Sequence, residues 1–410
     1  MTYLLGVDDT DSKFGHCTTH LAYLIVDELL RLGCGVPAYP RLVRLNPNVP
    51  FKTRGNAAVC VEFEASERLA DDAFRAAERL LLAEADVANG ANSALIMARE
   101  ERDPEFFRRL YLRALNGVVN FRGVIRELSK MGVRHKLLGN GMGAVGAAAS
   151  LGFKESDDHT YELIAYRMPG SCGTPRAVDP SSVAEMEAAT FPHTFNSLDH
   201  GSGRVLVAPK GPDPVLLGVR GDSPTAVLDA FRRVRFDEEP LGYMVYATNQ
   251  CTDAHLDEEL QVPLKAYSSG WLTGKVASTR VERGSHMTIS LSVGDSKVAC
   301  MVYEPSGDLR FMARLLRAGD KVRVFGGVRR ASSKNPAALN VERIDVLASK
   351  SALPGSYLPS PRAQRHLTKQ LVRYGNESQT KSPIIEGWIK GPASPLPTPS
   401  SPSRPRRKSS

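Results

Sequence analysis

Long hydrophobic runs are missing from this sequence. No apolar stretch approaches the roughly 18 or more residues of a membrane-spanning helix. The first residues also lack the basic and hydrophobic pattern of a secretory signal peptide. We therefore expect a cytoplasmic protein with no membrane partner.

Cysteines are few and far apart. The sequence has six, and no two of them form the Cys-x-x-Cys pair of zinc sites or redox motifs. We expect reduced, mostly buried thiols and no bound zinc. Three histidines in the second half also lack metal-ligand spacing, so we expect hydrogen-bonding roles for them. They are His193, His200 and His255.

Acidic residues are scarce in the C-terminal segment. Residues 350–410 contain eleven Lys or Arg and only two acids, whereas the whole chain has a net charge of +8, so the rest of the chain is close to neutral. A basic extension favours a polyanionic partner, with an affinity that falls steeply with salt. A solvated tail without a partner is equally compatible with the charge alone. The Pro- and Ser-rich composition from Gly391 onward predicts disorder.

Three carboxylates lie within four residues near the N-terminus. Asp8, Asp9 and Asp11 follow an apolar run that predicts a strand, and the periodic segment 20–32 predicts a helix. Open α/β sheets bind ligands at the carboxyl ends of their strands, and the Gly-His-Cys-Thr-Thr segment near the helix start favours phosphate. A divalent cation would relieve the repulsion between the carboxylates, and Mg²⁺ is often bound together with nucleotide phosphates. The alternative is that these residues serve only turns and helix caps.

Two further segments have residues suited to a nucleotide. The sequence Lys52-Thr53-Arg54-Gly55-Asn56 precedes an alternating strand and could hold phosphate, although solvated surface cations are the alternative. The run Gly141-x-Gly143-x-x-Gly146 matches a dinucleotide-binding fingerprint only in its letters, because it lacks the required strand and acid. Its small residues instead predict close helix packing beside the nucleotide.

The length and the order of predicted elements indicate several domains. A chain of 410 residues is too long for one ordinary core. Strands and helices alternate over 156–262, which predicts a ferredoxin-like domain. Residues 268–348 contain five predicted strands with a helix between the third and fourth, the order of an OB-fold. With the acidic stretch in a domain over 1–155 and a basic, Pro/Ser-rich tail over 349–410, the predicted fold is multidomain α/β and α+β.

Six motifs of this chain resemble those of one enzyme family. In order they are Gly-Val-Asp-Asp-Thr-Asp-Ser with Cys-Thr-Thr, Thr-Arg-Gly-Asn, Gly-Thr-Pro-Arg, His-Thr-Phe-Asn, Gly-Pro-Asp-Pro-Val-Leu-Leu-Gly-Val-Arg-Gly-Asp and Thr-Asn-Gln-Cys-Thr-Asp-Ala-His. Together they resemble the archaeal 2-agmatinylcytidine synthetases, which modify the wobble cytidine of the isoleucine tRNA with a CAU anticodon. The resemblance extends to about residue 347.

The resemblance implies an ATP-dependent ligase with a kinase-like domain over 1–155, a ferredoxin-like domain, and an OB-fold for tRNA. The kinase-like domain would phosphorylate one of its own threonines and the C2 oxygen of the cytidine. The matching threonine is Thr18, with Thr19 as the fallback, and Asp8, Asp9 and Asp11 match the acids around Mg²⁺ and the phosphates. The expected nucleotide contacts are Gly6, Asp8, Thr10, Gly15, His16, Cys17, Thr18, Thr19, Arg54, Gly55 and Asn56.

Agmatine is the amine substrate that the resemblance implies. Because it is a dication near neutral pH, its guanidinium group requires carboxylate or carbonyl oxygens, and its amine must lose a proton before it attacks. Asp199, Asp222 and Asp253 are hypothetical contacts for agmatine, with turn roles as the alternative. The hypothetical phosphate contacts are Arg54, Arg176 and Arg220.

The chain departs from this family in one respect. Family members have a four-cysteine zinc ribbon after the barrel, and the sequence beyond Leu347 contains no cysteine. We expect the basic tail to replace part of the tRNA contact. Two other functions stay open: a non-catalytic RNA-binding protein with an OB-fold, and a related kinase or ligase that acts on a different base or amine.

Overall fold

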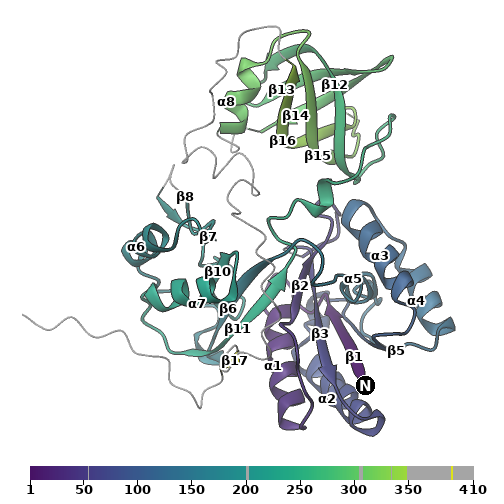
Figure 1. Cartoon of the computed structure of the whole chain (residues 1–410), viewed down its shortest axis with the longest axis vertical. Coiled ribbons are helices and arrows are strands. Elements are labelled where there is room, and N and C mark those ends of the chain that lie inside the picture. The colour runs from purple at the N-terminus through teal and green to yellow at the C-terminus, as the bar shows by residue number, and fades with distance from the viewer. Residues whose placement is uncertain (54, 200–202, 304–307, 334, 349–388, 391–410) are drawn as a thin grey trace, which may run out of the picture.

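The computed structural model describes residues 1–53, 55–199, 203–303, 308–333, 335–348 and 389–390. Its largest element is a ten-stranded sheet in the order β5-β4-β1-β3-β2-β11-β6-β10-β7, with β17 paired to β11 (Figure 1). The strands are β1 (Thr2–Asp8), β2 (Arg41–Arg44), β3 (Ala57–Glu64), β4 (Ala94–Arg99), β5 (Arg134–Leu137), β6 (Thr160–Arg167), β7 (Thr194–Phe195), β10 (Val215–Gly221), β11 (Pro240–Thr248) and β17 (Ile389–Lys390).

The sheet is antiparallel at every described pairing except that of β2 with β11. The expectation of an open α/β arrangement around the acids is therefore wrong in its strand directions. The acids do leave the carboxyl end of β1. In an antiparallel sheet that end lies beside the starts of the neighbouring strands, so the site can draw residues from both kinds of strand end.

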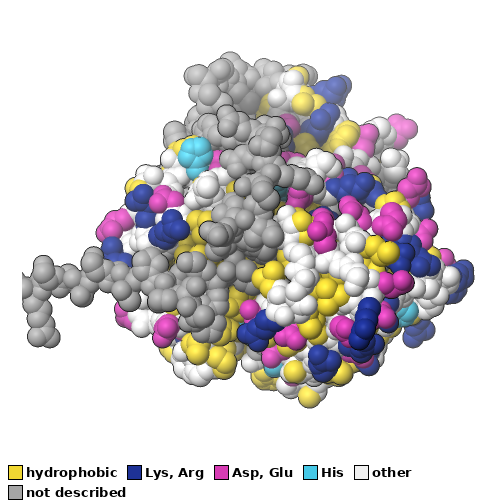
Figure 2. All heavy atoms as spheres, turned by 60° about the horizontal axis from the view of Figure 1, so that its bottom comes forward, with side chains coloured by type: hydrophobic (Ala, Val, Ile, Leu, Met, Phe, Trp, Pro, Cys, Tyr) yellow, Lys and Arg dark blue, Asp and Glu magenta, His cyan; other side chains and the backbone are white. Residues whose placement is uncertain are grey.

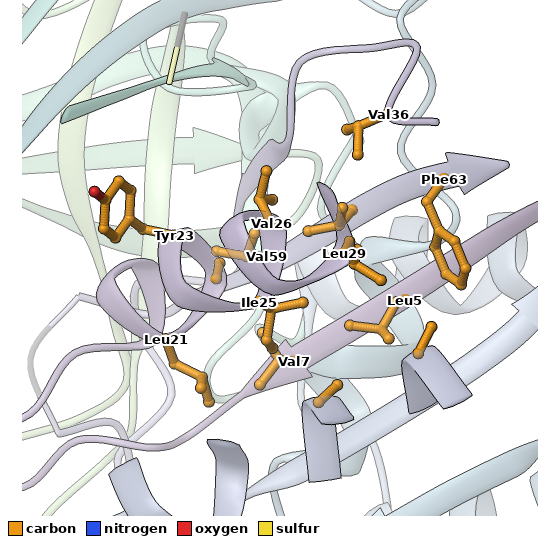
Figure 3. Packing of buried hydrophobic residues seen from close by; sticks show 14 of the residues in the cluster. Leu5, Val7, Leu21, Tyr23, Ile25, Val26, Leu29, Val36, Val59 and Phe63 are labelled. Atoms are coloured by element: carbon orange, nitrogen blue, oxygen red, sulfur yellow. The ribbon is translucent and has the colours of Figure 1, made fainter. Parts of the chain in front are cut away.

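Helices cover both faces of the first half of this sheet. On one face, α1 (Thr18–Arg31) and α2 (Glu67–Glu84) bury their apolar sides against β1 and β3. Leu21, Ile25 and Leu29 of α1 point toward Leu5 and Val7 of β1 (Figure 3). The other face is covered by α3 (Pro104–Asn116), α4 (Phe121–Lys130) and α5 (Ala144–Ser150).

The helix α5 lies very close to β1. A Cβ atom added to Gly6 would lie 2.1 Å from the carbonyl oxygen of Ala147. Only glycine permits this approach at that point of the strand. The prediction of close helix packing by the small residues from 139 to 149 is confirmed in this respect.

The second half of the sheet has helices α6 (Pro180–Thr190) and α7 (Pro224–Arg233), which pack on β6, β10 and β11. Both have N-caps typical of helix starts: Asp179 accepts a hydrogen bond from Ser181 N, and Ser223 accepts one from Ala226 N. A separate two-stranded ribbon joins β8 (Leu198–Asp199) to β9 (Arg204–Val205), so the strand expected over 204–209 is shorter than predicted.

A closed barrel stands at one end of the molecule (Figure 1). Its strand order is β12-β13-β14-β16-β15, and α8 (Asp308–Leu315) comes between the third and fourth strands in sequence. The five strands and the helix predicted from the sequence are all present. The strands are β12 (Ser269–Val281), β13 (Met287–Val293), β14 (Ser296–Val302), β15 (Lys321–Arg329) and β16 (Ala338–Ala348).

The loop after β2 joins the barrel to the sheet. Asn46 is fully buried, and its amide donates to the carbonyl of Tyr267, while Asn48 Nδ2 donates to Ser269 Oγ at 2.9 Å. A Cβ atom on Gly327 of β15 would lie 1.8 Å from Asn48 Nδ2. The barrel therefore meets the sheet through side chains that interlock with its backbone.

The tail expectation falls largely outside the described residues. Of residues 349–410 the structure describes Ile389 and Lys390, which pair with β11. Among the described residues no helix combines the length and apolar character needed to cross a membrane.

Candidate active site

The acidic stretch begins where β1 ends. The backbone N–H of Asp9 donates to Asp8 Oδ1 at 2.7 Å. Burial, followed by the charges of Asp9 and Asp11, raises the pKa of Asp8 well above its usual value. Burial and the charge of Asp11 raise the pKa of Asp9 to about 6. Three acids thus lie close enough together to oppose one another's ionisation.

Residues from the segment before β4 hold this stretch in place. Asp9 has a positive φ of 57°, and its carboxylate accepts a hydrogen bond from Asn92 N while its carbonyl accepts one from Ser93 Oγ at 2.7 Å. Asp86 accepts from the Ser12 hydroxyl, and its own N–H donates to Thr10 O. The sequence analysis missed Asp86, Asn92 and Ser93, because their role depends on a strand pairing that no local pattern reveals.

Two glycines before and in α5 make room for the acids. A Cβ atom on Gly146 would lie 1.9 Å from Asp8 Oδ2, and one on Gly143 would lie 2.9 Å from Asp8 O. The helix backbone therefore lies against the Asp8 carboxylate. This contact explains the spacing of small residues that resembled a dinucleotide fingerprint.

The threonines expected to receive phosphate lie at the start of α1. The hydroxyl of Thr18 lies 3.1 Å from that of Thr10. Tyr246 of β11 donates to Thr19 O at 2.7 Å, and the Thr19 hydroxyl lies 3.1 Å from Cys17 Sγ. Burial raises the pKa of the Cys17 thiol, so it stays protonated. The structure thus brings Thr18 next to the acidic stretch and fixes the first turn of α1 to the second half of the sheet.

Several other predicted residues lie at the same edge of the sheet as Asp8. The strand register places the ends of β1, β2, β10 and β11 and the starts of β3, β4 and β6 along that edge. Asn56 comes just before β3, and its Nδ2 donates to Asn46 O. Arg54 lies outside the described residues. The predicted residues at or next to this edge are Gly55, Asn56, Arg220, Asp222 and Asp253.

A buried carboxylate lies between two arginines on this edge. Glu162 of β6 is 3.3 Å from Arg44 Nη2 and 3.1 Å from Arg220 Nη2. Burial opposes its ionisation, but the two guanidinium groups outweigh burial and lower the pKa of Glu162. The amide of Asn249 also brackets the backbone of Arg44, at 2.7 and 2.8 Å. The cluster carries a net positive charge, and sequence reasoning had found only Arg220.

Arg176 has a structural role here. Its guanidinium group donates to the carbonyls of Gly211, Asp213 and Val215 and to the Asp213 carboxylate. Its side chain is only 5% exposed. These bonds use its donors, so the predicted phosphate contact at Arg176 is corrected to anchoring of the 211–215 loop. That loop adjoins the acidic stretch, because a Cβ atom on Gly15 would lie 3.8 Å from Pro212 O.

The three aspartates expected to hold agmatine lie in different places. Asp222 follows β10 and accepts from His193 Nδ1 at 2.8 Å. Asp253 follows β11 with a positive φ of 57°. Asp199 lies on the separate ribbon of β8 and β9, paired in register with Arg204. The sheet edge therefore brings Asp222 and Asp253, but not Asp199, to the side of the acids.

The histidines have hydrogen-bonding partners, as expected. His193 pairs with Asp222, and His255 Nε2 lies 3.1 Å from Glu342 of β16. His200 lies outside the described residues. In the part of the chain that the structure describes, no three His, Cys, Asp or Glu side chains are grouped so as to hold a metal by themselves.

Two models of protein families match the chain. The model described as the TiaS TCKD domain matches residues 4–140, and the one described as the TiaS FLD domain matches residues 141–255. A 2-agmatinylcytidine synthetase TiaS from Cenarchaeum symbiosum, named for its isoleucine tRNA, is 42% identical over 94% of this chain and 96% of its own length. That of Pyrococcus horikoshii is 37% identical over 79% of this chain and 76% of its own.

Solved structures agree with the sequence relatives. A complex of TiaS with its isoleucine tRNA and ATP superposes with a TM-score of 0.80 and 28% identity, covering 93% of this chain and 99% of that chain. A complex of TiaS with the same tRNA, AMPCPP and agmatine gives a TM-score of 0.75 and 30% identity, covering 84% of this chain and 83% of the other.

Proposed function

The chain belongs to the TiaS family of 2-agmatinylcytidine synthetases, and from this we propose how its own residues perform the reaction. It is an ATP-dependent ligase that joins agmatine to C2 of the wobble cytidine in the isoleucine tRNA with a CAU anticodon. The single observation that carries the proposal is the buried acidic stretch with the Thr18 hydroxyl beside it. Since tRNA is its substrate, we place its action in the cytoplasm.

The carboxylates of Asp8, Asp9 and Asp11 would hold Mg²⁺ together with the phosphates of ATP. Mg²⁺ commonly takes one or two carboxylates and completes its shell with water and phosphate oxygens, so a closed set of three protein ligands is unnecessary. The raised pKa values of Asp8 and Asp9 fit this role, because nearby positive charge would favour their ionised forms. Bound Mg²⁺ would neutralise charge on the transferring phosphoryl group.

The residues around Thr18 would position the phosphoryl acceptor. Thr10 sets the direction of the Thr18 hydroxyl, and Tyr246 fixes the carbonyl of the next residue. Thr18 is the phosphorylated residue that the family resemblance assigns, and Thr19, whose hydroxyl lies next to Cys17, remains the fallback.

The overall reaction needs the C2 oxygen of the cytosine to become a leaving group. A P–O bond forms between the γ-phosphoryl group and this oxygen as the bond to ADP breaks. The amine of agmatine, after losing a proton, then attacks C2, and phosphate departs with the oxygen. Asp222 and Asp253 are our candidates for the agmatine contacts, and the net positive cluster around Glu162 makes Arg220 a candidate for nucleotide phosphate.

The same proposal covers the finer architecture. We assign residues 1–155 to a kinase-like domain, 156–262 to a ferredoxin-like domain and 268–348 to an OB-fold. Support for the first boundary comes from α5, which packs on β1 and against Asp8 and therefore belongs with the acidic site. The strand order of the barrel, with a helix between its third and fourth strands, supports the OB-fold.

Mass spectrometry of the tRNA tests this function directly. The purified chain is incubated with ATP, Mg²⁺, agmatine and the CAU-anticodon isoleucine tRNA, and the anticodon nucleosides are analysed. We expect 2-agmatinylcytidine with the wild type and none with Asp8→Asn. Binding without any change in mass would favour the non-catalytic alternative, and a product with a different amine from a mixture would favour a related ligase.

A further inference from the structure

One outer face of the barrel combines aromatic rings with positive charge. The strands β12, β15 and β16 lie side by side, and Leu272, Val322 and Val324 point into the barrel core. Because side chains alternate along a strand, their neighbours face outward. We call the outward set Trp271, Lys275, Lys321, Arg323, Phe325 and Arg343 the basic-aromatic face.

The two arginines of this face are stacked on its aromatic rings. The guanidinium carbon of Arg323 lies 4.4 Å from the centre of the Trp271 ring, and that of Arg343 lies 4.6 Å from the Phe325 ring. Trp271, Phe325 and Arg343 occupy one row across the three strands. Such stacking holds a guanidinium group flat, which is the form in which arginine contacts phosphates and bases.

The two lysines lie directly opposite each other. Lys275 of β12 pairs in register with Lys321 of β15, and both side chains are exposed. Like charges in opposed positions of a sheet are unfavourable. Asp345 is the acid of these rows, and it pairs with Arg343 at 2.9 Å. The remaining positive charge therefore suits an external polyanion.

Other parts of the surface are less one-sided. On the face shown in Figure 2, Lys and Arg side chains lie among Asp and Glu. The chain's own tail is a poor occupant for the basic-aromatic face, because residues 350–410 contain eleven Lys or Arg and two acids.

The basic-aromatic face adjoins the route to the candidate active site. Trp271 Nε1 donates to Asp257 O, and η3 (Ala254–Leu256) lies beside β12, with His255 paired to Glu342 of β16. The segment that contains η3 leads directly from Asp253 at the sheet edge. A strand of RNA on this face would therefore extend toward the acids.

We propose that the basic-aromatic face of β12, β15 and β16 binds the sugar-phosphate backbone and a base of the substrate tRNA. This rests on the proposed function and adds a contact surface to it. OB-folds usually bind oligonucleotides on the face of their second and third strands, which here are β13 and β14. The proposal places an RNA contact on a different side of the barrel.

Charge removal at matched positions tests the proposal. The variant K275A/K321A removes two cations from the face, and R283A/K297A removes two exposed cations from the β12–β13 hairpin and β14. Affinity for the CAU-anticodon tRNA is measured against salt in the full-length chain. We expect K275A/K321A to weaken binding several-fold and to reduce the slope of log affinity against log salt by about 1.4–1.8, at about 0.7–0.9 per lost phosphate contact. The control should change the slope by less than half as much.

A third variant separates stacking from charge. Arg323→Lys keeps the cation but removes the flat group on Trp271, so we expect about threefold weaker binding or more with an unchanged salt slope. An unchanged slope in K275A/K321A, or equal losses in both double variants, would overturn the proposal, as would wild-type affinity in Arg323→Lys.

Failure of the face and failure of the function give different results. If the wild type produces 2-agmatinylcytidine while K275A/K321A binds tRNA normally, the face is wrong and the function stands. If the wild type binds tRNA in a salt-dependent way that K275A/K321A reduces, but forms no product, the face stands and the proposed function is wrong.

Discussion

Asp8 and Asp9 show how single residues at this site oppose folding for the sake of binding. Both carboxyl groups are held where burial and neighbouring acids disfavour their charge. A protein selected only for stability would replace one of them by a neutral residue. Their retention makes sense if a cation and phosphates compensate for the repulsion when the substrate binds.

The titration of Asp9 gives the first prediction. Its pKa rises from 3.8 to about 6, so Asp9 favours the folded state below pH 4 and this contribution is lost as the pH rises through 6. We expect Asp9→Asn to leave stability unchanged at pH 4 and to raise it by about 1–3 kcal/mol at pH 7. Asparagine tolerates the positive φ at this position.

Thermal unfolding at several pH values without Mg²⁺ measures this effect. Activity should be lost in Asp9→Asn at every pH, because the neutral side chain binds a cation poorly. Equal gains in stability at pH 4 and pH 7 would show that the carboxylate is not under strain from its charge.

The agmatine contact is a second prediction at this scale. Asp222→Asn removes a charge next to His193 at the sheet edge, and we expect it to raise the apparent KM for agmatine about tenfold or more, with that for ATP little changed. Asp199→Asn, on the ribbon of β8 and β9, is the matched control and should leave both constants near wild type. Steady-state kinetics at saturating tRNA measures them. An unchanged agmatine KM in Asp222→Asn means that the assignment is wrong.

At the scale of elements, the sequence predicted most strands and helices but not the way in which they meet. The helices α1 and α7 and all five barrel strands follow clear periodic patterns and lie close to their predicted ranges. The short helix α4 and the edge strand β5 were missed, because β5 is a four-residue strand of partly exposed, mostly polar residues.

The site shows the same division between local and distant information. Asp8, Asp9, Asp11 and Thr18 lie near one another in sequence, so a local motif sufficed to find them. Arg176 was misjudged because its partners, the carbonyls of the 211–215 loop, are far away in sequence and leave no pattern. The pairing of Arg44 with Glu162 was missed for the same reason.

The contact of α5 with Asp8 gives a prediction about an element. A Cβ on Gly146 would lie 1.9 Å from the Asp8 carboxylate, so Gly146→Ala must displace either the helix or the acid. We expect at least about a hundredfold loss of ATP-dependent modification, together with destabilisation of about 1–3 kcal/mol. Gly123→Ala in α4 has no atom within 4 Å of its new Cβ and should be neutral or slightly stabilising.

Single-turnover phosphorylation with labelled ATP and urea unfolding give the two quantities. Retention of full activity in Gly146→Ala would show that the position of Asp8 against α5 does not matter for the reaction.

At the scale of the whole molecule, binding of a large RNA depends on parts that lie far from the acids. The basic residues from 350 to 410 are one such part. We expect deletion of this segment to weaken tRNA binding and to flatten its salt dependence, because several phosphate contacts are lost. Phosphorylation of Thr18 without tRNA should continue at its normal rate. An identical salt slope in the shortened chain would remove the tail from the account of tRNA binding.

The joint between barrel and sheet gives the last prediction. Gly327 lies so close to Asn48 that a Cβ there would be 1.8 Å from Nδ2, and Asn48 in turn donates to Ser269. We expect Gly327→Ala to disturb the placement of the barrel, and thereby to lower tRNA modification about tenfold while Thr18 phosphorylation stays near wild type. Small-angle scattering should report a changed average shape.

Asn48→Ala supplies the matched control in a double-mutant cycle. Alone it removes one bond across the joint and should cost about 1 kcal/mol. In the Asn48→Ala background Gly327→Ala should cost little, because the side chain that the new methyl group meets is gone. Additive effects of the two changes would mean that they act independently, and then the Asn48 side chain does not set the position of the barrel over the site.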